Sequence, residues 1–103
     1  MVSAAAVANP SLTTTASPNT SIGLQIFDHA GLVGGANPMG TVTFNLFGPG
    51  DNACTTPFFT STVAVAGGST NSQPFITNQA GTYRWRASYG GDANNAAVTT
   101  ALW

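Results

Sequence analysis

The sequence predicts an all-β protein, an antiparallel β-sandwich of about seven strands with an extended arm at its N-terminus. Apolar and polar residues alternate with the two-residue period of strands in several short segments, and clusters of Gly, Pro, Asn and Asp separate these segments. No segment has a helical period. Because 103 residues can bury one hydrophobic core but not two, we expect an arm over residues 1–10 and a single domain over residues 11–103.

Three strands are predicted in the first half of the chain. Residues 11–16 are rich in Thr and end at the turn sequence Ser-Pro-Asn. Residues 22–33 alternate, but Asp28 interrupts their apolar row, so we expect Asp28 to lie near a sheet edge and to be hydrogen-bonded. Residues 41–47 alternate most clearly, with a large apolar side chain at every second position. These segments therefore supply much of the predicted core.

The second half of the chain contains weaker strand signals. Residues 58–65 alternate and are followed closely by a Gly-Gly pair. Residues 72–77 contain Pro74, which a strand tolerates only at an edge or a bulge. Residues 96–103 follow a loop rich in Gly, Asp and Asn. The last strand is formed either by these residues or by the arm of a neighbouring subunit.

The most informative segment is AGTYRWRASY, residues 80–89. Its rings alternate with charged or small residues, which is typical of a half-buried antiparallel strand. Gly81 is followed two residues later by Tyr83, and Tyr83 two residues later by Trp85. This spacing matches the tyrosine corner of immunoglobulin-like sandwiches. The sequence therefore predicts an immunoglobulin-like sandwich with Tyr83 and Trp85 in its core.

The composition restricts the partners of the protein. Charged residues make up 5% of the chain, there is no Lys or Glu, and the net charge is -1. Two Arg residues cannot form the basic patch that captures nucleic acid or an anionic membrane. No apolar run is long enough for membrane insertion, and the N-terminus lacks the basic residues of a signal peptide. Weak charge repulsion instead favours a homo-oligomer or a larger protein assembly.

Four motifs in order resemble a known family. PSLTTTASP, NPMGTVTFNLFGPGD, FTSTV and AGTYRWRASYGGDANN extend over residues 10–95. Together they are similar to the bacterial immunoglobulin-like (Big-type) repeat domains of actinobacterial-type surface proteins. The resemblance implies a non-catalytic role as a spacer, stalk or adhesive module. It also implies a second Cys as partner of Cys54, but Leu102 occupies roughly that place. The family has one further strand, so either residues 96–103 serve as the last strand or a strand is missing.

The resemblance gives the N-terminal arm a role. In a tandem array, the segment that precedes PSLTTTASP is the closing strand of the preceding repeat. We therefore expect the arm to complete the open sheet edge of a neighbouring subunit through main-chain hydrogen bonds. The arm residues expected at this contact are Val2, Ala4, Ala6, Val7 and Ala8.

The function predicted on this basis is that of a structural module displayed in many copies outside the cell. It would be a virion decoration or tail-surface subunit, or a self-assembling filament subunit, at an extracellular or virion surface. An excised repeat of a secreted adhesin or stalk fits the same observations. A third alternative is a carbohydrate-binding module that recognises a glycan through exposed rings. The candidate ligand-facing aromatic residues are Phe47, Phe58, Tyr89 and Trp103.

Catalysis, metal binding and cofactor binding are not expected. His29, the only His, lies on the opposite strand face from Asp28, so the two cannot form a catalytic pair. The three Asp residues have no spacing that suggests paired catalytic carboxylates. Asp92 and the Asn residues after it supply only a fragment of a calcium site. Cys54 has no partner within the chain, which leaves an intermolecular disulfide open.

Overall fold

A computed structural model describes residues 7–51 and 53–100. No helix occurs in these ranges, and all pairs of strands are antiparallel. The prediction of an all-β protein is thus confirmed. The strands are β1 (Ser11–Ala16), β2 (Gln25–Ile26), β3 (Asp28–Val33), β4 (Thr41–Phe47), β5 (Phe59–Ala64), β6 (Ser69–Asn71), β7 (Phe75–Ile76), β8 (Arg84–Tyr89) and β9 (Val98–Thr99).

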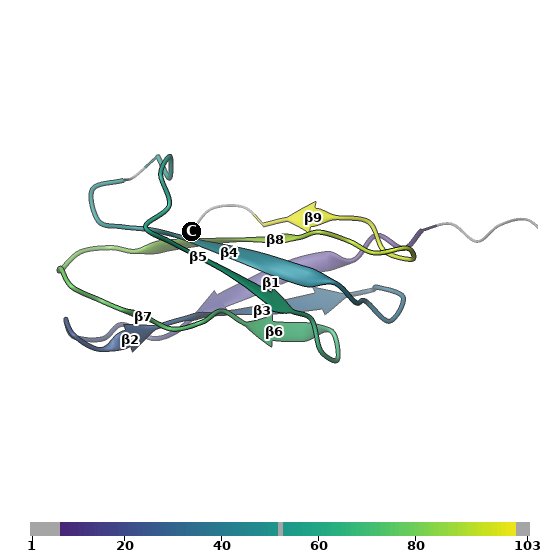
Figure 1. The fold of residues 1–103 in the computed structure, drawn as a ribbon, viewed down its shortest axis with the longest axis horizontal. Helices are drawn as coiled ribbons and strands as arrows, with labels where there is room; N and C mark the ends of the chain where they lie inside the picture. The colour runs from purple at the N-terminus through teal and green to yellow at the C-terminus, as the bar shows by residue number, and fades with distance from the viewer. Residues whose placement is uncertain (1–6, 52, 101–103) are drawn as a thin grey trace, which may run out of the picture.

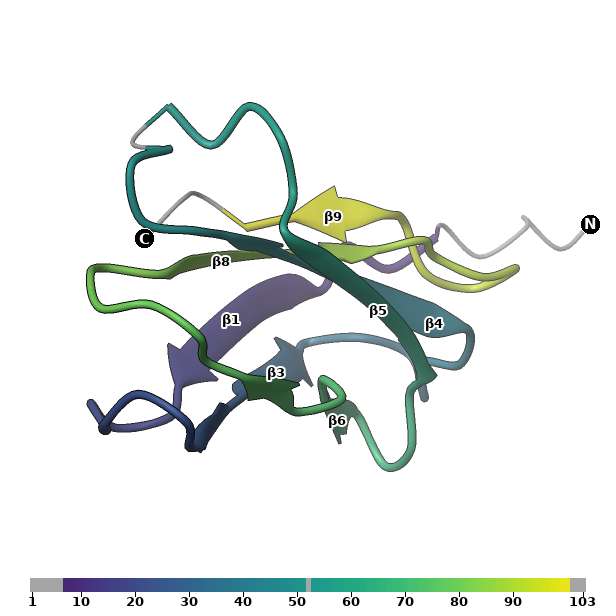
Figure 2. The same ribbon diagram turned by 60° about the vertical axis from the view of Figure 1, so that its left-hand side comes forward.

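The strands form two layers. One layer is a four-stranded sheet with the order β5-β4-β8-β9, and the other contains a three-stranded sheet with the order β1-β3-β6. The short pair β2-β7 extends the second layer at one end, on the left of Figure 1. Figure 2 shows the two layers turned, with β1, β3 and β6 below the sheet that contains β4 and β8.

The core lies between these layers. Strands β4 and β8 are neighbours, so that Leu46 pairs with Trp85 and Phe44 pairs with Ala87. Alternate side chains of both strands point inward, and the rings of Phe44 and Trp85 meet edge to face with centroids 6.3 Å apart. Side chains from the opposite layer complete the core. Its buried members are Ile26, Ala30, Val42, Phe44, Leu46, Trp85, Ala87 and Tyr89.

The sequence predicts some strand boundaries correctly and misses others. The predicted bounds of β1 and β4 are confirmed. The predicted strand over residues 22–33 is divided at Phe27, whose main-chain N–H donates to the Ser17 hydroxyl. This division gives β2 and β3 different partners, β7 for the first and both β1 and β6 for the second. Strand β6 was not predicted, because its short polar sequence has no alternating pattern.

The expectation for Asp28 is wrong. Asp28 begins β3, the middle strand of its sheet, and is completely buried. Its main chain is satisfied, because its N–H donates to the Ser72 hydroxyl and its carbonyl accepts from the Ser72 N–H. Neither carboxylate oxygen accepts a hydrogen bond of good geometry from a described residue. The interior of the sandwich therefore contains a carboxyl group without full compensation.

The last described strand comes from the chain itself. Val98 and Thr99 pair with Tyr89 and Ser88 of β8, and the N–H of Thr100 continues the ladder to the carbonyl of Ala87. Part of the predicted last strand is thus present, while residues 101–103 lie outside the described residues. The other outer strand of this four-stranded sheet is β5.

The end of the predicted arm contacts its own domain. The N–H of Ala8 donates to the carbonyl of Asn94, and the N–H of Ala96 donates to the carbonyl of Ala8. These bonds form a parallel bridge between Ala8 and Asn95. Val7 is 49% exposed. The other predicted contact residues of the arm, Val2, Ala4 and Ala6, lie outside the described residues.

Candidate functional site

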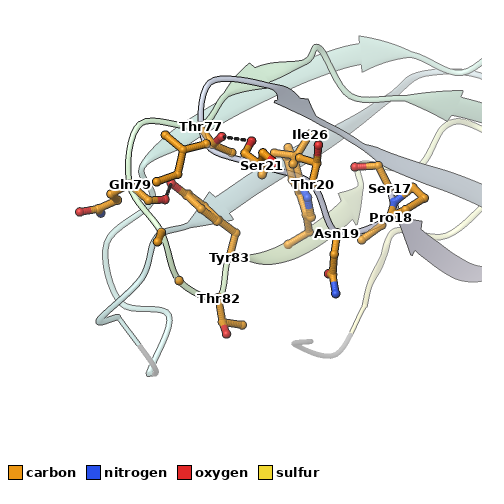
Figure 3. Close-up of a pocket in the computed structure, with 15 residues that line it drawn as sticks. Ser17, Pro18, Asn19, Thr20, Ser21, Ile26, Thr77, Gln79, Thr82 and Tyr83 are labelled. Carbon is orange, nitrogen blue, oxygen red and sulfur yellow. Dashed lines mark hydrogen bonds between the residues drawn. The ribbon is translucent and has the colours of Figure 1, made fainter.

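A cleft opens at the end of the sandwich that carries the β2-β7 pair (Figure 3). Its volume is about 750 Å³. Figure 3 shows Ser17, Pro18 and Asn19 on one side and Gln79, Thr82 and Tyr83 on the other. Two loops therefore form its walls, one between β1 and β2 and one between β7 and β8. Ile26 and Trp85 also line the cleft, so it reaches the edge of the core.

Local hydrogen bonds fix the two loops to one another. The main-chain N–H of Gly23 donates to the carbonyl of Thr77, and the N–H of Thr77 donates to the carbonyl of Leu24. The Thr77 hydroxyl is buried and bonds the carbonyl of Leu24 at 3.0 Å. These contacts continue the short β2-β7 ladder into the loops, so the base of the cleft is held by main-chain bonds.

Tyr83 forms one wall of the cleft and holds its own loop. The Tyr83 hydroxyl donates to the carbonyl of Gln79 at 2.9 Å, four residues upstream. This is the bond that defines a tyrosine corner. Trp85, two residues later, is 2% exposed. The predicted placement of Trp85 in the core is therefore confirmed, and Tyr83 packs against the core while remaining partly exposed.

The corner bond yields a measurable contribution to stability. Tyr83→Phe is expected to lower the free energy of unfolding by about 0.5–1 kcal/mol, because one partly exposed hydrogen bond is lost and little packing changes. Denaturant unfolding measures this loss. Tyr89→Phe is the matched comparison. The Tyr89 ring is completely buried and its hydroxyl bonds Met39 and Asp92, so we expect a larger loss there. If Tyr89→Phe lowered the free energy of unfolding by no more than Tyr83→Phe does, the expectation that the buried Tyr89 hydroxyl contributes more than the partly exposed Tyr83 hydroxyl would be contradicted.

The Asp92 loop, at the opposite end of the sandwich, is a structural network. The Asp92 carboxylate accepts hydrogen bonds from the N–H groups of Met39 (2.7 Å) and Asn94 (2.8 Å) and from the Asn95 amide (2.9 Å). These donors, the Met39 N–H foremost, lower the pKa of Asp92 to about 2. Asn95 is buried and bonds Ala36 in both directions. The side-chain oxygen atoms of Asp92 and Asn95, two members of the suggested calcium-site fragment, thus hold two loops together.

The other candidates for chemistry are not brought together. No group of three or more His, Cys, Asp or Glu side chains that could hold a metal ion occurs among the described residues. His29 is exposed and bonds Asn71, while Asp28 faces the interior, as the strand alternation predicts. Burial raises the pKa of Asp28 to about 6, and the His29 main chain and ring and the Thr14 hydroxyl only partly oppose this rise.

The predicted aromatic platform is not formed. Phe47 is 3% exposed and lies under the Arg86 guanidinium, 6.0 Å from its ring centroid, and Tyr89 is completely buried. Both predictions of ligand-facing rings are therefore wrong. Phe58 is 49% exposed, but its ring is tilted by 47° to Phe75 and by 57° to Tyr83, so no flat surface results. Trp103 lies outside the described residues.

Cys54 is buried and has an unusual backbone conformation. The residue is 7% exposed and forms no disulfide within the described part of the chain, and its φ angle is 53°. Its loop is held by Asp51, whose carboxylate accepts from the main-chain N–H groups of Thr55 and Thr56. An intermolecular disulfide therefore requires this loop to open.

Sequence reasoning missed the cleft itself. Its walls come from turn segments about sixty residues apart, and neither segment carries a motif that marks a ligand site. The available signal was the local absence of charge together with several hydroxyl and amide side chains. No described residue belongs to a helix that is long and apolar enough to cross a membrane. Comparison with protein-family models, curated proteins and solved structures finds no match to this chain.

Proposed function

We propose that the protein is a non-catalytic structural module, an immunoglobulin-like domain that is displayed in many copies on an extracellular or virion surface. The strand order supports the immunoglobulin-like assignment. If the seven strands of the two larger sheets, β1, β3, β4, β5, β6, β8 and β9, are lettered in chain order as A, B, C, C′, E, F and G, the sheets become A-B-E and C′-C-F-G. The tyrosine corner at the start of strand F supports the same assignment.

The observation that carries the proposed assembly role is the uncharged edge strand β5. Strand β5 pairs with β4 on one side and with no described strand on the other. It is six residues long and contains no charged residue and no Pro. Soluble proteins usually protect such edges with Lys, Pro, bulges or covering segments. An unprotected edge favours pairing with a strand from another chain.

The N-terminal arm of a second copy is the proposed occupant of this edge. Its residues 2–6, VSAAA, are small and uncharged, and β5 likewise contains no charged residue. Ala8 is already tied to its own domain, so the segment that reaches a neighbour is the part before Val7. This arrangement produces a subunit of a virion surface or a filament. A repeat of a secreted adhesin, which meets its neighbours within one polypeptide, uses the same surfaces.

Light scattering tests this proposal. The full chain is expected to have a mass of at least a dimer that rises with concentration, while a chain that lacks residues 2–6 is a monomer. Thr62→Lys places a charge on exposed β5 and is expected to give monomers, because edge charges oppose strand addition. Ser88→Lys, on the interior strand β8, is the matched control and should still assemble. A full chain that stays monomeric at all concentrations rejects the proposal.

A further inference from the structure

The cleft between the β1–β2 and β7–β8 loops has the properties of a small-molecule site. Its volume of about 750 Å³ falls within the range of about 300–1,000 Å³ found for ligand pockets. Apolar residues, Ile26 and Trp85, lie beside polar loop residues in its lining. From these features and the chemistry below, we infer that the cleft binds a neutral saccharide, a role beyond the proposed assembly function.

The polar side chains of the cleft are uncharged and available. None of the residues that line it is charged, and the two Arg residues of the chain are not among them. The side chains of Asn19, Thr20 and Thr82 make no hydrogen bond with any described residue. Asn19 and Thr20 come from one loop and Thr82 from the other, on opposite sides of the cleft (Figure 3). The cleft thus offers both donors and acceptors without a charge.

Trp85 lines the cleft and also belongs to the core. Its side chain is almost completely buried, and buried indole N–H groups usually have a hydrogen-bond partner. Here the indole N–H donates to no described residue. Among the described residues, the only fully buried side-chain polar atoms without a hydrogen bond are the two Asp28 carboxylate oxygens, so the indole nitrogen is not fully buried. Because Trp85 lines the cleft, a bound acceptor can satisfy this N–H.

These properties favour a saccharide over other ligands. A saccharide hydroxyl both donates and accepts hydrogen bonds, which suits the hydroxyl and amide groups of Asn19, Thr20 and Thr82. The partly exposed ring of Tyr83 provides an apolar wall for a sugar face. A phosphate or an acidic sugar would lack a cationic partner here. An extended peptide would need a free strand edge, whereas the cleft is walled by loops.

A fluorescence titration tests this inference. The protein is produced in a host that does not glycosylate, because Asn19-Thr20-Ser21 is a glycosylation sequon. Trp103→Phe leaves Trp85 as the only Trp. Hexasaccharides of glucose in β-1,4, β-1,3 and α-1,4 linkage, a mannose pentasaccharide and sialyllactose are titrated separately. We expect a saturable change in Trp85 fluorescence with at least one neutral probe and none with sialyllactose.

Variants locate the site. Asn19→Ala with Thr82→Ala is expected to weaken binding about tenfold or more, because two ligand hydrogen bonds are lost. Asn94→Ala, an exposed Asn at the opposite end of the sandwich, should bind as the parent does. Binding that survives the double variant, or no response to any neutral probe at millimolar concentration, overturns the inference. A response to a peptide of residues 2–7 alone would overturn it and assign the cleft to assembly. The outcomes of the titration and of the variants do not depend on the oligomeric mass obtained by light scattering, so a failure of this inference can be distinguished from a failure of the proposed assembly function.

Discussion

Asp28→Asn is expected to make the protein more stable than the parent by about 2–3 kcal/mol at pH 7.5. Burial raises the pKa of Asp28 in the folded protein from 3.8 to about 6, so folding at neutral pH keeps a charge in the interior. An Asn side chain has nearly the same shape and carries no charge. It shares with the protonated acid the cost of an unpaired polar group, so the variant and the parent should be nearly equal near pH 4.

The pH dependence follows from the direction of this shift. Because the folded-state pKa of Asp28 lies above the unfolded value, the folded protein binds more protons between pH 4 and 6. The free energy of unfolding of the parent therefore falls as the pH rises through this range. Denaturant unfolding between pH 4 and 8 should show this slope in the parent and not in Asp28→Asn.

Asp51→Asn is the matched control for this experiment. The Asp51 carboxylate accepts from the main-chain N–H groups of Thr56 and Thr55, which lower its pKa. Removal of this group should leave the slope between pH 4 and 6 in place. A parent without that slope, or an Asp28→Asn variant less stable than the parent at pH 7.5, would show that the buried carboxylate is compensated.

The acidic limit of stability has a different cause. The donors around Asp92 lower its pKa to about 2, and the pKa of Asp51 is lowered as well. For both groups the folded protein binds fewer protons than the unfolded chain, so their contribution is lost as the pH falls below about 4. Together with Asp28, these groups place the maximum stability near pH 4.

Gly81→Ala is expected to lower the free energy of unfolding by about 2–5 kcal/mol. The φ angle of Gly81 is +139°, a conformation that residues with a side chain rarely adopt. A Cβ atom at Gly81 would also lie 2.5 Å from the Cβ atom of Pro49, which forces the β7–β8 loop away from its neighbour. Backbone strain and steric overlap therefore act together.

Gly50→Ala separates these two effects. Gly50 has a φ angle of +89°, but a Cβ atom added there would meet no atom within 4 Å. We expect a loss of about 1 kcal/mol, due to the backbone alone. Thermal and denaturant unfolding of both variants measure the difference. Equal losses would show that the loop moves away from Pro49 without cost.

The strands that were predicted correctly share one physical property. Along β4 and β8, one face is buried and the other faces solvent, so the two-residue period appears directly in the sequence. The division at Phe27 and the strand β6 depend on partners elsewhere in the chain, Ser17 in the first case and β3 in the second. Such pairing leaves no local pattern, and the sequence therefore could not predict it.

The site was less predictable than the fold. Candidate ligand-facing rings were chosen by residue type, from which the exposure of a ring cannot be inferred. Tyr89 is on the core face of its strand, and Phe47 is covered by Arg86. The cleft depends on how two distant turns meet, which only the three-dimensional arrangement reveals. For Asp28, the position in an apolar row correctly predicted an unusual environment. The predicted position near a sheet edge was wrong, because Asp28 is completely buried.

The pairing of Ala8 with Asn95 has a consequence for exchange between molecules. Because the domain between Ala8 and Asn95 is already folded, these two main-chain bonds order only the short segment from Ala8 to the start of β1 at Ser11, and the entropy of that segment opposes them. Release of Ala8 breaks no contact of the buried core. An identical Ala8 from another copy can make the same two bonds, so the competition depends on protein concentration relative to the effective concentration of the tethered segment. If many copies are displayed on a surface, as proposed above, their crowding shifts that competition towards exchanged, mutually linked domains.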